Sequence, residues 1–346
     1  MRTTQRITIE QIQTAADLLI AGKLVAFPTE TVYGLGADAL NPHAVKRIFE
    51  AKGRPSDNPL IAHIASHEQL TQLAIEVSPL AKLLIERFWP GPLTLVMDKV
   101  PDLPDDLTAG LDTVAVRMPE DPIALDLIRR VGRPIVAPSA NRSGRPSATT
   151  WESVLIDLDG RIDGVLCGPP TRIGLESTVV DTTTDEPVIL RHGAITQEMI
   201  QRVWPSGRSS STHLGLEPIP GSNGPAAAEV PLDFARRSPG TRHRHYQPKA
   251  RVVLFDSIDQ LGELPIAVGI LAIASKSDLH AIESDLSGKY PGAKLCVCSS
   301  FDDYAGRLFE FFRECDLENV PTIYCQRVEL SGLGRAIMDR LDRAAG

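Results

Sequence analysis

Hydrophobic and polar residues form two kinds of pattern, one helical and one strand-like, through roughly the first two hundred residues of the chain. In residues 9–21 apolar side chains recur every three or four positions, which is the spacing of one face of an α-helix. Gly22 ends that pattern, and the apolar run 24–27 has the character of a short buried strand. Because such patterns alternate along the chain, the sequence predicts an α/β fold. Further helices are expected at 44–52 and 80–88, and strands at 60–64, 93–96, 114–116, 135–137, 165–167, 178–180 and 188–190.

The regular patterns stop between residues 206 and 249. This stretch contains six prolines, and its six basic residues outnumber its three acidic ones. Such a composition favours an extended or irregular connector. Strand patterns resume afterwards, so we predict a first domain at 1–205, a linker at 206–250 and a smaller α/β domain at 251–346. Within the last part, strands are expected at 251–255, 266–273, 294–297 and 322–324, and helices at 258–261, 304–314 and 333–341.

The overall composition is that of an ordinary soluble protein. The 346 residues can form two domains with separate cores, and 42% are hydrophobic and 23% charged. The formal net charge of -8 excludes a general nucleic-acid coat but allows a local basic site. The five cysteines are scattered, and the N-terminus is a poor signal peptide. We therefore expect a cytoplasmic protein with reduced thiols.

The motif PTETVYGLG at 28–36 directly follows the predicted strand at 24–27. Its two threonine hydroxyls and two glycines suit the close approach of a small polar ligand to the backbone. The alternative is a turn held by local hydrogen bonds from its own side chains.

A second motif, KGRPSDNPL, follows the predicted helix at 44–52. Lys52 and Arg54, held by Pro55, form a natural phosphate clamp that combines a point charge with a guanidinium fork. The stretch is not a Walker A loop. Alternatively, both cations lie in solvent at a helix C-terminus, where the helix dipole favours them. His63, in the next strand, either packs in the core or reaches a ligand.

Further polar clusters follow later strands. Arg117 ends the strand at 114–116, where it can pair with a ligand carboxylate or form a surface salt bridge. The segment 137–148 is dense in hydroxyls, an amide and arginines, which suits the phosphates and ribose of a nucleotide. The clusters at 176–181 and 191–194 complete the set. Open α/β sheets bind ligands in loops of this kind, beyond the ends of their strands.

Several catalytic patterns are missing from the sequence. It contains no G-x-S-x-G elbow and no H-E-x-x-H motif, and it shows no obvious Cys–His nucleophile arrangement. With no covalent nucleophile assigned, an enzyme that positions substrates for phosphate chemistry fits best.

Taken in order, the motifs PTETVYGLG, KGRPSDNPL, PGPLT, VAVRMP, APSANRSGRPSAT and ESTVVD resemble the YrdC-like threonylcarbamoyl-AMP synthase family. The resemblance covers about residues 10–205. The element 238–248 and the small unit after it resemble the two-domain form of the family. This resemblance implies an open twisted sheet whose concave face holds both substrates, with a Rossmann-like C-terminal domain.

The resemblance also implies a nucleotidyltransferase that makes threonylcarbamoyl-AMP and pyrophosphate from L-threonine, bicarbonate or CO2, and ATP. A downstream transferase would use the product for the threonylcarbamoyladenosine modification of tRNA next to the anticodon. Mg2+ would arrive with the phosphates, without protein side chains as ligands. We also expect weak RNA binding, and we expect no contact with a membrane. The resemblance places threonine at Thr31, His63, Arg117, Ala137 and Ser177, and ATP at Lys52, Arg54, Asn58, Thr113, Ser139, Asn141, Ser147, Arg191 and Tyr246.

The linker departs from the family pattern, because Thr241 stands where a bulky apolar residue is expected. Arg242-His-Arg-His-Tyr246 nevertheless offers cations and an aromatic ring that could cover a bound nucleotide. The reactive adenylate benefits from exclusion of water, so we expect a lid whose far end is anchored by the second domain. A basic connector without this role is the alternative.

Two other functions share parts of this pattern. A carbamoyltransferase domain of the hydrogenase-maturation type shares the sheet and several motifs, but such chains carry zinc-binding Cys-x-x-Cys pairs that this sequence lacks. A non-catalytic RNA-binding module on the same concave surface would show steeply salt-dependent RNA affinity without nucleotide turnover.

Overall fold

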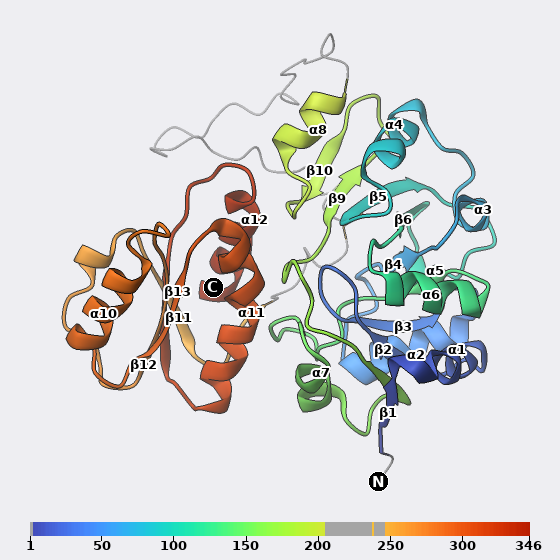
Figure 1. Ribbon diagram of the computed structural model, residues 1–346. Coiled ribbons are helices and arrows are strands. Elements are labelled where there is room, and N and C mark those ends of the chain that lie inside the picture. Colours follow the sequence, from blue (N-terminus) through green and yellow to red (C-terminus); the bar gives the residue numbers. More distant parts are fainter. Residues whose placement is uncertain (1–2, 205–236, 239–245) are drawn as a thin grey trace.

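Two α/β units lie side by side in the protein (Figure 1). The computed structural model describes residues 3–204, 237–238 and 246–346, so most of the predicted linker, with Thr241 and the Arg242–His245 stretch, lies outside the described residues. The first unit contains a ten-stranded sheet and the second a four-stranded sheet. The predicted fold class, a large α/β sheet followed by a smaller one, is confirmed.

The large sheet is mixed, with strand order β1-β8-β2-β3-β7-β4-β6-β5-β9-β10. At its centre β4 runs parallel to β6 and antiparallel to β7, while β5 is antiparallel to β6 and parallel to β9. Most of the central strands are buried throughout, which is why they read as short apolar runs in the sequence. The strands are β1 (Gln5–Thr8), β2 (Val25–Phe27), β3 (Gly34–Asp38), β4 (Ile61–His63), β5 (Leu93–Asp98), β6 (Thr113–Arg117), β7 (Ile135–Val136), β8 (Gly164–Cys167), β9 (Thr178–Asp181) and β10 (Val188–Arg191).

Five of the helices described in this domain, α2, α4, α6, α7 and α8, begin after a residue whose side chain caps them. At the start of α2, the Asn41 side chain accepts hydrogen bonds from two backbone N–H groups, and Pro42 occupies the first turn. Gly53, with φ 63°, ends the helix in the left-handed region and turns the chain toward Arg54. This geometry places the Lys–Gly–Arg motif beside the sheet. The helices are α1 (Ile12–Ile20), α2 (Pro42–Lys52), α3 (His67–Leu70), α4 (Pro79–Phe88), α5 (Asp105–Thr108), α6 (Pro122–Val131), α7 (Trp151–Leu158) and α8 (Gln197–Val203), with a 3-10 turn, η1, at Ile9–Gln11.

The last residues of the motif at 28–36 enter β3, a strand that we did not predict. Two glycines weaken any sequence signal for a strand. The structure explains them by close packing, since a Cβ on Gly36 would lie 2.9 Å from the ring of Phe27 and 3.1 Å from the carbonyl oxygen of Val25. The polar half of the motif is thereby fixed between two paired strands.

The second domain has an all-parallel sheet of order β11-β14-β12-β13. In Figure 1, α11 and α12 lie between this sheet and the first domain, and α10 lies on the far side. We did not predict α10, whose one buried residue, Leu286, gives it no apolar stripe. Among the described helices, none combines the length and apolar character needed to cross a membrane. The elements are β11 (Arg251–Phe255), η2 (Ile258–Gln260), β12 (Val268–Ile273), α10 (Leu279–Lys289), β13 (Lys294–Cys298), α11 (Phe301–Leu317), β14 (Thr322–Gln326) and α12 (Gly334–Ala345).

The two domains share a hydrophobic cluster. Val32 and Leu175 of the first domain are buried together with Tyr246 and with Phe309 of α11. Beside them Gly174, with φ 78°, lies so close to α11 that a Cβ on it would be 2.6 Å from the carbonyl oxygen of Ala305. The domains therefore meet with tight packing next to the segments that follow β2 and precede β9.

We predict that Gly174→Ala destabilises the protein more than Gly132→Ala. Both glycines have positive φ, 78° and 74°, which costs an alanine about 1–2 kcal/mol in either place. Only the alanine at 174 also meets backbone atoms of the other domain, whereas one at 132 has no atom of the described chain within 4 Å. Urea denaturation measures both losses, and equal losses would contradict the tight domain contact.

Candidate functional site

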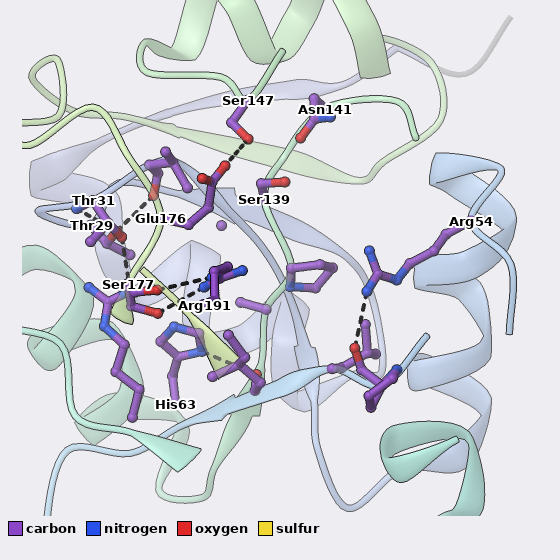
Figure 2. Close-up of a pocket in the computed structure, with 18 of the residues that line it drawn as sticks. Thr29, Thr31, Arg54, His63, Ser139, Asn141, Ser147, Glu176, Ser177 and Arg191 are labelled. Carbon is purple, nitrogen blue, oxygen red and sulfur yellow. Dashed lines mark hydrogen bonds between the residues drawn. The ribbon is translucent and has the colours of Figure 1, made fainter. Parts of the chain in front are cut away.

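A cavity lies over the middle of the large sheet, against β3, β4, β6 and the segments that flank β7 and β9 (Figure 2). The structure brings most of the predicted site residues to its walls. The predicted residues that line it are Thr31, His63, Arg117, Ala137 and Ser177 from the threonine set, and Arg54, Ser139, Asn141, Ser147, Arg191 and Tyr246 from the ATP set.

Three predicted ATP residues do not line the cavity. Lys52 is buried, and its Nζ donates hydrogen bonds to the carbonyl oxygens of Ser139 and Asn141, both at 2.5 Å. Asn58 is fully buried, and its carbonyl oxygen accepts a hydrogen bond from Arg54. Thr113 is the first residue of β6, and Arg117 is the last. Lys52 thus holds the loop that carries Ser139 and Asn141. Direct contact of Lys52, Asn58 and Thr113 with ATP stays a prediction.

Arg117 ends β6 with its guanidinium buried against the motif at 28–36. It donates hydrogen bonds to the hydroxyl of Thr31 at 2.9 Å and to the carbonyl oxygen of Gly91 at 3.2 Å. A third nitrogen lies 2.6 Å from a carboxylate oxygen of Glu30. Both side chains of this ion pair are 4% exposed, so they are shielded from water. Sequence reasoning missed Glu30, although its place beside the two threonines of the motif offered a signal.

His63 extends from β4 into the cavity, where its Nδ1 lies 3.2 Å from the carbonyl oxygen of Ile61. Burial, with a further contribution from the charge of Arg117, lowers the pKa of His63 to about 3. The imidazole is therefore neutral at physiological pH. A neutral ring next to Arg117 adds no charge that would compete for an anion, and it can donate or accept one hydrogen bond.

Arg191 and Ser177 lie close to Thr31 and His63 in the cavity wall (Figure 2). Arg191 donates from Nε to the carbonyl oxygen of Ser177 at 3.0 Å and from another nitrogen to its hydroxyl at 3.1 Å. The same hydroxyl lies 2.7 Å from that of Thr94. Burial lowers the pKa of the Arg191 guanidinium, yet an arginine retains its charge at neutral pH. Arg191 is thus a fixed buried cation in the cavity wall.

Arg54 approaches from the end of α2. It donates to the carbonyl oxygens of Asn58 at 3.4 Å and Pro59 at 3.0 Å. Burial lowers the pKa of Arg54 to about 10, and burial together with the charge of Arg54 lowers the pKa of Lys52 well below its usual range. An anion entering the cavity would therefore stabilise both charges.

The loop between β7 and α7 carries the nucleotide motif. Asn141 donates both amide hydrogens to the loop itself, to the carbonyl oxygens of Arg142 at 2.8 Å and Arg145 at 2.9 Å. Its Oδ1 is buried without a hydrogen-bond partner among the described residues. The Ser147 hydroxyl donates to Glu176 at 2.5 Å. The loop thus presents an amide oxygen and a hydroxyl that are held in place before any ligand arrives.

Tyr246 is the part of the predicted lid that falls within the described residues. It is buried, with φ 67°, and its ring stacks on Phe309 at 5.3 Å between centroids. The Arg340 guanidinium lies 5.4 Å from the ring centroid. Burial raises the pKa of Tyr246 to about 12. Its ring therefore closes the cavity on the side of the second domain.

The described residues contain no cluster of three His, Cys, Asp or Glu side chains that could hold a metal ion. Glu176, which lines the cavity, already uses one oxygen for Ser147 and the other for Arg340. Asn141 Oδ1 is a neutral oxygen of the kind that Mg2+ accepts. This donor set fits a cation that arrives with phosphates and keeps water ligands, and it does not fit a permanent metal centre.

Sequence reasoning also missed Thr29, Arg145 and Glu176, all of which line the cavity. Thr29 and Glu176 were part of motifs that we singled out, but neither was assigned to a ligand. Thr29 Oγ1 lies 2.8 Å from Thr31 Oγ1 and donates to the carbonyl oxygen of Val32 at 2.7 Å, so it orients a predicted site residue. The signal was present in the motifs, but the partners of Glu176, Ser147 and Arg340, come from distant parts of the chain.

Family models match nearly the whole sequence. The Sua5/YciO/YrdC model, described as telomere recombination, matches residues 17–193. The model of the threonylcarbamoyl-AMP synthase C-terminal domain matches residues 195–346. The chain therefore belongs to the Sua5/YciO/YrdC family in its two-domain form, as the resemblance of the motifs predicted.

Relatives named threonylcarbamoyl-AMP synthase match almost the full length of this chain. The threonylcarbamoyl-AMP synthase of Pyrococcus abyssi is 44% identical over 99% of this chain and 96% of its own length. That of Bacillus subtilis is 43% identical over 97% and 93%. A crystal structure of P. abyssi Sua5 complexed with L-threonine has a TM-score of 0.78 and 40% identity, and the match covers 99% of this chain and 97% of that one.

The buried state of His63 predicts a pH dependence of stability. Its pKa is about 3 in the folded protein and about 6.5 when unfolded, so between these values the unfolded chain binds a proton that the native state does not. Stability should therefore fall as the pH is lowered through this window. His63→Gln should lessen the fall by up to about 1.4 kcal/mol per pH unit.

Urea denaturation at pH 6.5 to 5 measures this difference. All three tryptophans, Trp89, Trp151 and Trp204, lie in the first domain, so their fluorescence reports the unfolding of the domain that contains His63. The exposed His280→Gln in the second domain controls for the substitution itself. Parallel pH profiles for wild type and His63→Gln would show that His63 is protonated in the native state.

Proposed function

We propose that this protein is an L-threonylcarbamoyladenylate synthase, which makes threonylcarbamoyl-AMP and pyrophosphate from L-threonine, bicarbonate and ATP. The observation that carries this proposal is a single cavity lined by two sets of cations: Arg117, which pairs with a buried carboxylate, and Arg54 with Arg191, which donate to backbone carbonyls. One cation suits an amino-acid carboxylate, and the other two suit phosphates. The names of relatives that match the full chain support the same assignment.

Arg117 is the proposed partner of the threonine carboxylate, with Thr31, Ser177 and neutral His63 around it. Because Glu30 already pairs with Arg117, the guanidinium is held rigidly and shares its charge between two carboxylates. The threonine amine combines with CO2 to give a carbamate and releases a proton. Fixing the amino acid at its carboxylate leaves the amine end toward the rest of the cavity, where ATP is expected.

The carbamate oxygen then attacks the α-phosphorus of ATP, a new P–O bond forms, and the bond to the β-phosphate oxygen breaks to release pyrophosphate. Negative charge moves onto the leaving group during this step. Arg191 is buried and Arg54 half-buried, and both are fixed donors that stabilise such charge more strongly than water does. This catalysis needs substrate positioning and electrostatics, and no protein nucleophile takes part. Because this reaction transfers AMP to a carbamate, the proposed enzyme is a nucleotidyltransferase.

Mg2+ is the cofactor we propose, bound mainly by the phosphates and water. When bound, it neutralises phosphate charge. Asn141 is the side chain best placed to contact it or one of its waters, since Oδ1 is buried and has no hydrogen-bond partner among the described residues. The Lys52 ammonium fixes the backbone that carries this oxygen.

We propose further that the product serves a downstream transferase that modifies adenosine next to the anticodon of tRNA, and that the protein acts in the cytoplasm. Of the alternatives, the hydrogenase-maturation type of carbamoyltransferase is disfavoured, because residues 195–346 match the model of the threonylcarbamoyl-AMP synthase C-terminal domain. A purely RNA-binding role leaves the buried cations inside the cavity unexplained.

The reaction class has a direct test. Purified protein should release pyrophosphate from ATP when L-threonine and bicarbonate are both present, and only then. A coupled enzymatic assay for pyrophosphate measures the release, with reactions lacking either substrate as controls. Release of inorganic phosphate and ADP in place of pyrophosphate and an adenylate would contradict the proposed reaction.

The two sets of cations should affect different substrates. Arg54→Ala should weaken ATP binding roughly ten-fold or more, because a charge-assisted hydrogen bond contributes on the order of 1.5–3 kcal/mol. Arg117→Met should instead weaken threonine binding. Removing Arg117 alone also leaves Glu30 buried without its partner, a change that costs about 3–5 kcal/mol of stability, so the double variant Arg117→Met/Glu30→Gln is needed beside it. If calorimetry finds both substrates binding normally to all three variants, these assignments are wrong.

A further inference from the structure

Two arginines of the second domain extend into the first domain and are almost fully buried there. Arg313, on α11, is 5% exposed, and Arg340, on α12, is completely buried. An arginine is seldom buried this deeply unless its donors are paired, because leaving water costs the guanidinium several kcal/mol. Their partners therefore show what these two side chains do.

Arg313 binds the loop that follows β7 through its backbone. It donates to the carbonyl oxygens of Pro146 and of Ser147, the latter at 3.3 Å. It also pairs at 3.1 Å with Asp157 of α7, whose carboxylate accepts from Arg145 at 2.7 Å and from the backbone N–H of Arg142 at 3.1 Å. Burial alone would raise the pKa of Asp157, but the neighbouring arginines hold it below its ordinary value.

Arg340 acts on the same loop through Glu176. It donates from Nε to one oxygen of Glu176 at 3.0 Å, while the other oxygen accepts the hydroxyl of Ser147 at 2.5 Å. Figure 2 shows Glu176 between the Ser147 loop and the cavity. Without Arg340, a buried carboxylate would face the space assigned to a triphosphate and would repel it. The ring of Tyr246 lies against Arg340 and helps to shield this pair.

These contacts point to one inference, which rests on the proposed function. We propose that Arg313 and Arg340 are positioning residues of the nucleotide site: Arg313 fixes the backbone that carries Ser147, and Arg340 neutralises Glu176 and thereby permits ATP to bind. The second domain then completes the nucleotide site, which goes beyond anchoring a lid. Arg117, which is assigned to threonine, is held by its own partners in the first domain, so threonine binding should depend on neither arginine.

The test uses the full-length protein. ATP affinity is measured by calorimetry, and turnover is measured separately as the release of pyrophosphate. Arg340→Met, which removes the charge but keeps a long side chain, should weaken ATP binding at least ten-fold and change threonine binding less than three-fold. Arg340→Lys should stay within about three-fold of wild type for ATP. Arg327→Met, at a half-exposed site on the same domain, is the matched control and should bind both substrates normally.

Charge compensation makes a sharper prediction for the double variant. Glu176→Gln in the Arg340→Met background removes the unpaired carboxylate, so most of the lost ATP affinity should return. Arg313→Met should weaken ATP binding and Arg313→Lys should restore part of it, because Lys keeps the charge but offers no fork for two carbonyls. If Arg340→Met fails to fold, the double variant, which buries no unpaired charge, answers the same question.

Equal losses of ATP and threonine affinity in Arg340→Met would mean a purely structural role and overturn the inference. Normal ATP affinity in Arg340→Met, or no recovery in the double variant, would also overturn it. A wild-type protein that binds ATP but releases no pyrophosphate would count against the proposed function alone, because ATP affinity is measured independently of turnover.

Discussion

The burial of positive charge is the constraint on which the rest of this structure depends. Arg54, Arg117 and Arg191 are held in a cavity where desolvation disfavours a charged group, and burial lowers the pKa of two of them. Backbone carbonyls, hydroxyls and the carboxylate of Glu30 compensate part of this cost. The sheet provides the rigid frame that keeps these donors in place. In the proposed function, anionic substrates supply the remaining compensation, and substrate binding and the electrostatics of catalysis then share one origin.

The same constraint explains how the two domains fit together. The buried Asp157 and Glu176 of the first domain find their cationic partners, Arg313 and Arg340, on α11 and α12 of the second. The hydrophobic cluster around Phe309 excludes water from these pairs, which strengthens them. A domain that the sequence suggested only as an anchor thus holds Ser147 and Glu176, two residues of the cavity wall.

Much of the fold could be predicted from the sequence, because the central strands are short apolar runs and the helices that pack on them have apolar faces. The polar motifs also identified most of the cavity lining, since they follow strands of one sheet. Pairings between distant segments could not be predicted. Glu176 lies 164 positions from Arg340 in the sequence, and no local pattern connects them. Lys52 was assigned to phosphate by its charge, yet its ammonium is engaged by the backbone of another loop. The β3 strand was missed because its glycines serve close packing with Phe27.

We propose that buried charges position the substrates for direct attack, with no covalent intermediate on the protein. Mass spectrometry of a single turnover with 13C-labelled bicarbonate tests it most directly, since intact protein and free nucleotide can be weighed from the same sample. The account predicts that the label appears only in a free nucleotide that also contains threonine. A protein that becomes heavier by an adenylyl or a labelled carbamoyl group during turnover would contradict it.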